Sequence, residues 1–111
     1  MIRVGVFGAG GRMGATVCRA VLDDAELELV AAVDPEHAGI DLDQLGIHGT
    51  GLHVGTKPGA LADAGAEVAV DFTVREAARD NLSWCADNGV HAVVGTTGFT
   101  SDDIAQLRTQ F

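Results

Sequence analysis

Residues 2–14 read Ile2-Arg3-Val4-Gly5-Val6-Phe7-Gly8-Ala9-Gly10-Gly11-Arg12-Met13-Gly14. The apolar run Ile2–Phe7 predicts a strand that leads into a glycine-rich turn, and the turn opens a helix predicted from Met13 to about Leu22. Glycine permits a positive φ and lets the backbone approach a bound group closely, because it has no Cβ. The first N–H groups of a helix have no partner within the helix and attract an anion such as a pyrophosphate. The stretch is therefore typical of a dinucleotide-binding fold.

A second apolar run, Leu27–Val33, ends at Asp34, which lies 20 residues after Gly14. Dinucleotide folds place an acidic residue near this spacing, where its carboxylate accepts hydrogen bonds from a ribose. The glycines depart from the strict Gly-x-Gly-x-x-Gly pattern, because Met13 occupies the position of the last glycine. A glycine-rich turn without a ligand is the alternative interpretation. The strand before the turn, the helix after it and the acid downstream together favour a dinucleotide site.

The composition is that of one small domain spanning residues 1–111, with 47% hydrophobic residues to form a core. The net charge of −9 argues against binding to nucleic acid or an anionic membrane surface, since both require a basic face. No apolar run approaches the roughly 20 residues that cross a bilayer, and we expect a strand rather than a signal peptide at the start of the chain. Cys18 and Cys85 fall inside predicted helices. We expect reduced, partly buried thiols of a cytoplasmic protein, with a disulfide or redox pair as the alternative.

The rest of the chain alternates between apolar strands and helices. Thr73-x-x-Glu76 is a capping box that predicts a helix start, and Asn88-Gly89 predicts the end of that helix. Continuous apolar strands between helices predict a parallel sheet covered on both faces. We therefore expect an α/β fold of the Rossmann type, doubly wound, with strand order 3-2-1-4-5. Further strands are expected at Leu52–Val54, Val68–Phe72 and Val90–Val94, and further helices at Pro58–Ala64, from Thr73 to about Asn88, and from Thr100 to the chain end.

Three loops converge at one edge of the predicted sheet: Gly8–Gly14, Asp71-Phe72-Thr73 and Gly95-Thr96-Thr97-Gly98-Phe99. Ligands of such sheets bind in the crevice at this edge, where the strand order reverses. The first loop would hold the pyrophosphate, and the other two would reach the nicotinamide half of a dinucleotide. Thr96 and Thr97 offer hydroxyl and N–H groups that suit a carboxamide or a carboxylate. The alternative for this last loop is an ordinary strand-to-helix turn. The alternative for Thr73 in the second loop is that it only caps the start of a helix.

The chain resembles the N-terminal domain of the bacterial 4-hydroxy-tetrahydrodipicolinate reductases (dihydrodipicolinate reductases) of the diaminopimelate and lysine pathway. Three stretches carry the resemblance: Val4–Gly14, Val70-Asp71-Phe72-Thr73 and Val93-Val94-Gly95-Thr96-Thr97-Gly98-Phe99. Their order and spacing match across essentially all of the 111 residues. The Gly-Thr-Thr-Gly-Phe segment that follows Asp-Phe-Thr is more specific to this family than the glycine turn.

The resemblance implies hydride transfer from NADH or NADPH to a cyclic, imine-type dicarboxylate formed from 4-hydroxy-tetrahydrodipicolinate. It implies that Asp34 holds the adenosine ribose and that Thr97 reaches a substrate carboxylate. The pyrophosphate would be cradled by the turn and the start of the helix, and the nicotinamide would be bordered by the two later loops. The cofactor-binding residues implied are Gly8, Ala9, Gly10, Gly11, Arg12, Met13, Asp34, Phe72, Thr73, Gly95, Thr96 and Thr97.

The residue after Asp34, the acid implied to hold the ribose, predicts the cofactor preference. Some members of the family carry an arginine there, which suits the 2′-phosphate of NADPH, whereas this chain has Pro35. Proline cannot pair with a phosphate, and the carboxylate of Asp34 repels one. We therefore expect NADH to be preferred or both cofactors to be used, since Arg12 remains available to a phosphate.

The chain departs from the family in one respect. Members continue into a substrate domain with a Glu-x-His-His-x-x-Lys-x-Asp-Ala-Pro-Ser-Gly-Thr-like segment, and nothing like it occurs here. We therefore assign no catalytic residue and interpret residues 1–111 as a dinucleotide-binding domain without its substrate domain, inactive alone, from a homotetrameric enzyme. We expect exposed or capping histidines and assign no metal site. Metal binding by His48 and His53 is the alternative, but no carboxylate or cysteine spacing supports it. The histidines are His37, His48, His53 and His91.

Two alternatives remain open from the sequence. The first is another nicotinamide enzyme with the same N-terminal fold, such as a homoserine- or aspartate-semialdehyde-type dehydrogenase, although Gly95–Phe99 argues against it. The second is a stand-alone module that binds a nucleotide or CoA without catalysis, which the lack of a catalytic acid would fit.

Overall fold

The computed structural model describes residues 1–95, 101, 104–105 and 109. Four strands alternate with three α-helices, and two 3₁₀ turns follow the second strand. The elements are β1 (Ile2–Phe7), α1 (Arg12–Asp23), β2 (Leu27–Val33), η1 (Pro35–His37), η2 (Leu42–Leu45), α2 (Gly59–Asp63), β3 (Val68–Asp71), α3 (Arg75–Asp87) and β4 (His91–Val94). The helix expected from Thr100 onward lies largely outside the described residues.

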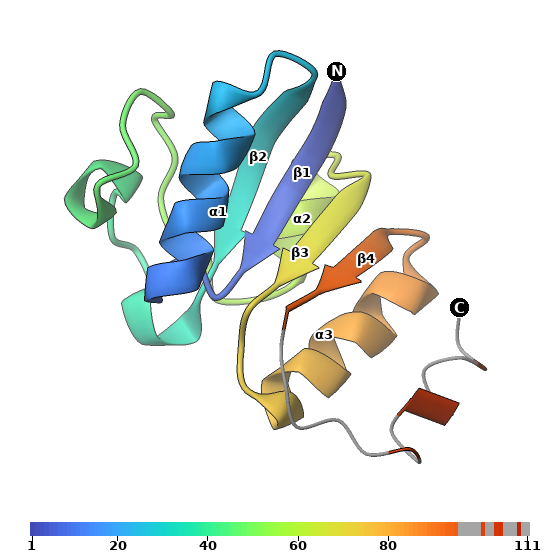
Figure 1. Ribbon diagram of the computed structural model, residues 1–111. Helices are drawn as coiled ribbons and strands as arrows, with labels where there is room; N and C mark the ends of the chain where they lie inside the picture. The colour runs from blue at the N-terminus through green and yellow to red at the C-terminus, as the bar shows by residue number, and fades with distance from the viewer. Residues whose placement is uncertain (96–100, 102–103, 106–108, 110–111) are drawn as a thin grey trace.

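The strands form one parallel sheet in the order β2-β1-β3-β4 (Figure 1). Their carboxyl ends lie in register, because Phe7 pairs with both Val33 and Asp71, and Asp71 pairs with Val94. The chain leaves β1 toward β2 on one side and continues through β3 on the other, so the order reverses between β1 and β3. The predicted Rossmann-type α/β fold is confirmed.

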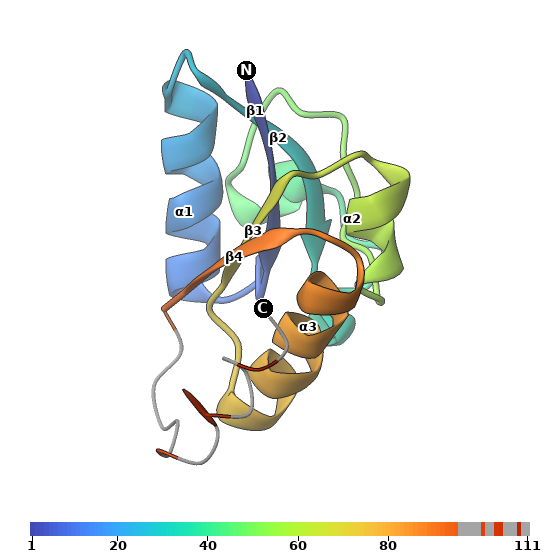
Figure 2. The same ribbon diagram turned by 90° about the vertical axis from the view of Figure 1, so that its right-hand side faces the viewer.

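Helices cover both faces of the sheet, with α1 on one face and α2 and α3 on the other (Figure 2). Alternate side chains of the strands therefore enter two separate apolar clusters. Val4, Val6 and Cys18 belong to the cluster under α1, and Phe7, Leu61 and Cys85 belong to the opposite cluster. Both cysteines are free and fully buried rather than partly buried, one on each face of the sheet, and this placement argues against a disulfide between them.

A β-bulge interrupts the pairing of β1 with β2. Val4 lies opposite Leu29, but the next residue of β1, Gly5, lies opposite Ala31. Val30 is therefore an extra residue in β2 without a partner of its own. Pairing is regular again from this point to the carboxyl ends of the strands.

The strand expected at Leu52–Val54 is not present, and this prediction was wrong. The segment runs beside β2, where the outer strand was expected, but it makes only an isolated parallel bridge between Val33 and Gly55 and an antiparallel one between Asp41 and His53. Positive φ angles at Gly46, Gly49 and Gly51 turn the backbone out of an extended course before a ladder can form.

The capping box predicted at Thr73 is also wrong. The N-cap of α3 is Val74, which makes no side-chain capping bond. The hydroxyl of Thr73 instead donates to Oδ1 of Asp71 at 2.6 Å. The other end of the helix was predicted correctly, since Asn88 is the C-cap and Gly89 follows with a φ of +68°.

Candidate functional site

The turn after β1 requires glycine at specific positions. Gly8 has a φ of +83°, and a Cβ there would lie 2.9 Å from the carbonyl oxygen of Phe72. A Cβ on Gly14 would overlap the carbonyl of Gly8, so α1 packs directly against the turn. Gly11 is the N-cap of α1 and offers no side-chain acceptor to the first N–H groups of that helix. The turn thus presents backbone donors at the positive end of a 12-residue helix.

Asp34 follows β2 at the same edge and is nine-tenths buried. Its Oδ2 accepts a hydrogen bond from the N–H of Gly10 at 3.0 Å, and its Oδ1 accepts one from the N–H of Glu36 at 3.1 Å. Nδ1 of His37 lies 3.1 Å from Oδ2 of the same carboxylate. Asp34 therefore ties the glycine turn to the 3₁₀ turn η1, whose N-cap it is.

The opposite wall is held by a second buried carboxylate, that of Asp71 at the end of β3. Oδ1 of Asp71 accepts from the N–H of Thr73 at 2.8 Å and from its hydroxyl, and Oδ2 accepts from Nδ2 of Asn81 at 3.1 Å. These bonds fix the loop between β3 and α3 against the body of α3. Burial, with the charge of Asp71 as a lesser cause, raises the pKa of the Cys85 thiol below this loop to about 11.

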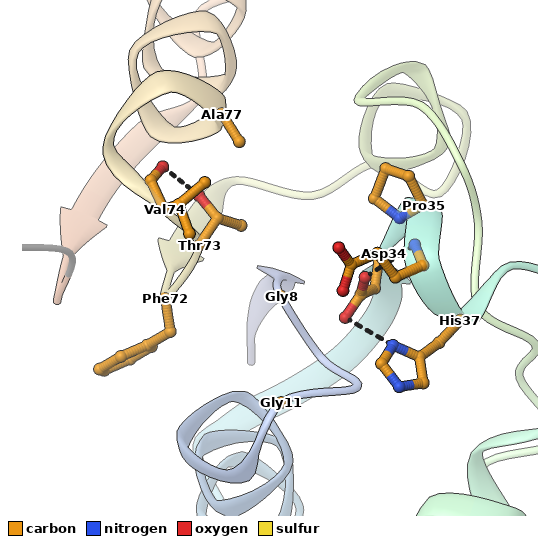
Figure 3. A pocket seen from close by; sticks show the side chains of 10 residues that line it. Gly8, Gly11, Asp34, Pro35, His37, Phe72, Thr73, Val74 and Ala77 are labelled. Carbon is orange, nitrogen blue, oxygen red and sulfur yellow. Dashed lines mark hydrogen bonds and ion pairs between the residues drawn. The ribbon is translucent and has the colours of Figure 1, made fainter.

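A pocket of about 390 Å³ lies between the two walls (Figure 3). Its floor is the glycine turn, one side is the segment from Asp34 to His37, and the other is the segment from Phe72 to Ala77. The pocket occupies the edge of the sheet between β1 and β3, where the order of the strands reverses. The lining residues are Gly8, Gly11, Asp34, Pro35, Glu36, His37, Phe72, Thr73, Val74 and Ala77.

The residues that follow the four aligned strand ends form one row along this edge. They are Gly8, Asp34, Phe72 and Gly95. The N–H of Gly8 donates to the carbonyl of Val33 at 2.8 Å, and three of the four row members line the pocket. The parallel register therefore brings together residues that are up to 87 positions apart in the sequence.

The structure brings five of the predicted site residues to the pocket: Gly8, Gly11, Asp34, Phe72 and Thr73. The others that are described lie beside it. Ala9 is fully buried in the core under α1, Gly10 packs against the ring of His37, and Gly95 lies against the ring of Phe72. Arg12 and Met13 are exposed in the first turn of α1, whereas Thr96 and Thr97 lie outside the described residues.

His37 corrects one expectation from the sequence. Its side chain is one-third exposed and lines the pocket, whereas we expected an exposed or capping residue. His48, His53 and His91 are exposed, as expected. The sequence did contain an indication, because Asp34-Pro35 is a typical N-cap and first residue of a helical turn. Such a turn brings the third residue after the cap, here His37, back toward the cap.

Other kinds of site find no support in the described part of the chain. It contains no group of three or more His, Cys, Asp or Glu side chains that could hold a metal ion. None of its helices is long and apolar enough to cross a membrane.

Comparisons with known proteins agree with this geometry. The chain is 46% identical over 108 residues to the 4-hydroxy-tetrahydrodipicolinate reductase of Corynebacterium efficiens, covering 97% of this chain and 36% of that protein. It is 44% identical over 113 residues to the reductase of the same name from Methanopyrus kandleri, covering 96% of this chain and 41% of that protein. Among solved structures, the dipicolinate-bound dihydrodipicolinate reductase of Paenisporosarcina sp. TG-14 has a TM-score of 0.78 at 27% identity, covering 99% of this chain and 43% of that chain.

The chain thus spans well under half the length of these relatives. Residues 2–110 match the family described as dihydrodipicolinate reductase, N-terminus. The match covers nearly the whole chain, and it agrees with the parallel sheet and with the pocket at its carboxyl edge. On these grounds the chain belongs to the family of dihydrodipicolinate reductase N-terminal domains.

Proposed function

We propose that residues 1–111 bind a nicotinamide dinucleotide for a reductase that acts on the dehydrated form of 4-hydroxy-tetrahydrodipicolinate. The observation that carries this proposal is the pocket between the glycine turn, Asp34 and the Phe72–Ala77 wall, at the point where the strand order reverses. The two curated relatives are named 4-hydroxy-tetrahydrodipicolinate reductase.

The residues present fit the cofactor. A dinucleotide needs a turn without side chains under its pyrophosphate, and the turn residues that line the pocket, Gly8 and Gly11, have none. N–H groups at the start of α1 would hold the pyrophosphate, and Asp34 would accept hydrogen bonds from the adenosine ribose. When bound, the nicotinamide supplies the hydride. Phe72, Thr73, Gly95, Thr96 and Thr97 would border its ring, and Thr97 would also reach a carboxylate of the substrate.

The remaining parts of the proposal concern the whole enzyme. The chain spans 36% to 41% of the two curated relatives, and we place the catalytic groups and the tetramer contacts in the part that it does not cover. We expect the domain alone to bind the cofactor weakly and not to reduce the substrate. We place the enzyme in the cytoplasm, and we expect it to use NADH in preference to NADPH or to use both.

The test is a calorimetric titration of this chain with NADH, NADPH and a CoA thioester. Gly11→Asp should abolish NADH binding, because it puts a carboxylate where the pyrophosphate would lie. It should leave the fold intact, since a Cβ on Gly11 meets its nearest neighbour, the carbonyl oxygen of Gly8, at an ordinary 3.5 Å and aspartate is a favourable N-cap. Asp34→Ala should weaken binding by removing the ribose acceptor.

The thermal midpoint of each variant is the matched control, so a loss of binding cannot be mistaken for a loss of folding. Binding of the CoA thioester alone would overturn the reductase proposal in favour of a CoA module. NADH binding that survives Gly11→Asp would place the dinucleotide elsewhere.

A further inference from the structure

We propose that His37 determines how this site chooses between NADH and NADPH, by offsetting the charge of Asp34 when its ring is protonated. The inference rests on the dinucleotide function proposed above and adds a residue to it. It also makes the choice of cofactor depend on pH.

The first support is geometric. Nδ1 of His37 lies 3.1 Å from Oδ2 of Asp34, with side-chain exposures of 33% and 12% (Figure 3). The ring is held there by the glycine turn, because a Cβ on Gly10 would overlap it. Nδ1 is buried and makes no hydrogen bond of regular geometry, so its contact with the carboxylate is an ion pair that forms when the ring gains a proton.

The second support is the charge of the pocket. Of the residues that line it, Asp34 and Glu36 are acidic, and His37 is the one that can become positive. Asp34 is the acid in contact with His37, and Glu36 lines the same pocket from the same turn, while the glycine turn presents Gly10, which has no side chain. The adjoining helix begins with Arg12, which is exposed. With a neutral ring the adenosine end of the pocket is therefore acidic.

The two cofactors differ only in the group next to Asp34. The 2′-hydroxyl of NADH donates a hydrogen bond to a carboxylate, whereas the 2′-phosphate of NADPH is repelled by one. A histidine side chain gains its positive charge between pH 8 and pH 5. A positive ring beside Asp34 cancels much of this repulsion, so affinity for the 2′-phosphate should rise relative to affinity for the 2′-hydroxyl as the pH falls.

The experiment measures the dissociation constants of NAD⁺ and NADP⁺, the acid-stable forms, at pH 8.0 and pH 5.8 by calorimetry on this chain. We expect the ratio of the NADP⁺ constant to the NAD⁺ constant to fall about fivefold more in the wild type than in His37→Asn. Asparagine keeps an N–H donor near Asp34 but carries no charge. The comparison is needed because the 2′-phosphate itself gains a proton near pH 6, and this contribution is the same for both proteins.

His48→Asn is the matched control. It removes a histidine that also pairs with an aspartate, at 3.0 Å from Asp43, but it does so on an exposed surface away from the pocket. It should behave as the wild type does. His37→Gln is a second neutral variant in case His37→Asn does not fold.

Each result bears on the proposal. Equal pH dependence in the wild type and in the neutral variants would overturn the role of His37, while the dinucleotide function would stand. A folded wild-type chain that binds neither NAD⁺ nor NADP⁺ would overturn the proposed function, and the role of His37 with it.

Discussion

At the scale of single residues, the tightest constraint is at Gly14. Its Cα faces the backbone of Gly8, and a Cβ there would overlap the Gly8 carbonyl. Backbone cannot rotate aside as a flexible side chain can, so Gly14→Ala should lower the free energy of unfolding by about 2–3 kcal/mol. Urea denaturation followed by circular dichroism measures this change. Gly11→Ser is the control, because its Cβ has room and serine is at least as good an N-cap as glycine, so we expect a change within about 0.5 kcal/mol; equal losses would contradict the packing argument.

The hydroxyl of Thr73 supports a second prediction. It donates to the buried carboxylate of Asp71 at 2.6 Å, and that bond anchors one wall of the pocket. Thr73→Val keeps the shape of the side chain but removes the donor, which should lower the free energy of unfolding by about 1–2 kcal/mol. Thr73→Ser restores the hydroxyl and should recover most of the loss. The same denaturation experiment decides the point, and two variants of equal stability would show that the bond contributes nothing.

Single residues also show how far the sequence could be interpreted. The placement of Asp34 at the sheet edge was predicted, because the end of an apolar strand and the distance from a glycine turn are both visible in the sequence. The position of His37 was missed, because it depends on how tightly η1 closes and on the space left by Gly10. Neither of these is a property of a repeating pattern.

At the scale of elements, apolar runs predicted four strands to within one residue at each end, because a strand covered on both faces must be apolar along its length. The predictions failed where a neighbouring residue turns the backbone aside or binds the side chain on which the prediction depended. Glycines with positive φ keep the segment near Leu52–Val54 out of the sheet. The hydroxyl of Thr73, which was expected to cap α3, instead donates to Asp71 two residues earlier. Asp71 also accepts a hydrogen bond from Asn81 of α3.

The helix α3 therefore begins without a side-chain cap, at an exposed valine. Val74→Ser would give the helix a capping oxygen, and we expect the free energy of unfolding to rise by about 0.5–1 kcal/mol. Val74→Ala removes the same apolar bulk but adds no acceptor, so the difference between the two variants in thermal and urea denaturation isolates the cap. A serine variant no more stable than the alanine variant would show that Asp71 and Thr73 already meet the needs of this helix start.

At the scale of the whole molecule, the two free cysteines are buried on opposite faces of the sheet and should make its stability depend on pH. Burial raises the pKa of Cys18 to about 11 and that of Cys85 to about 11, from an ordinary value of 9.0. Unfolded thiols ionise first, so the folded state should lose stability as the pH rises from 9 to 11, by about 2–3 kcal/mol for each thiol. Below pH 9 neither thiol affects the pH dependence of stability.

Urea denaturation at pH 8.0 and pH 10.5 measures this loss. Cys18→Ala and Cys85→Ala should each remove a share of it, and the double variant should show only what the remaining groups contribute. A pH dependence unchanged in the double variant would place its origin elsewhere in the molecule.

The bulge at Val30 has a consequence for how such domains are identified from the spacing of residues in their sequences. It adds a residue to the chain between the glycine turn and Asp34 but adds no length to β2, since Leu29 and Ala31 face adjacent partners on β1. Deleting it would leave a regular ladder with every later side chain on the same face as before. The number of residues between Gly14 and Asp34 can therefore differ by one without moving either residue in the fold. A motif search that demands a fixed number of positions would reject chains whose sites are identical in space.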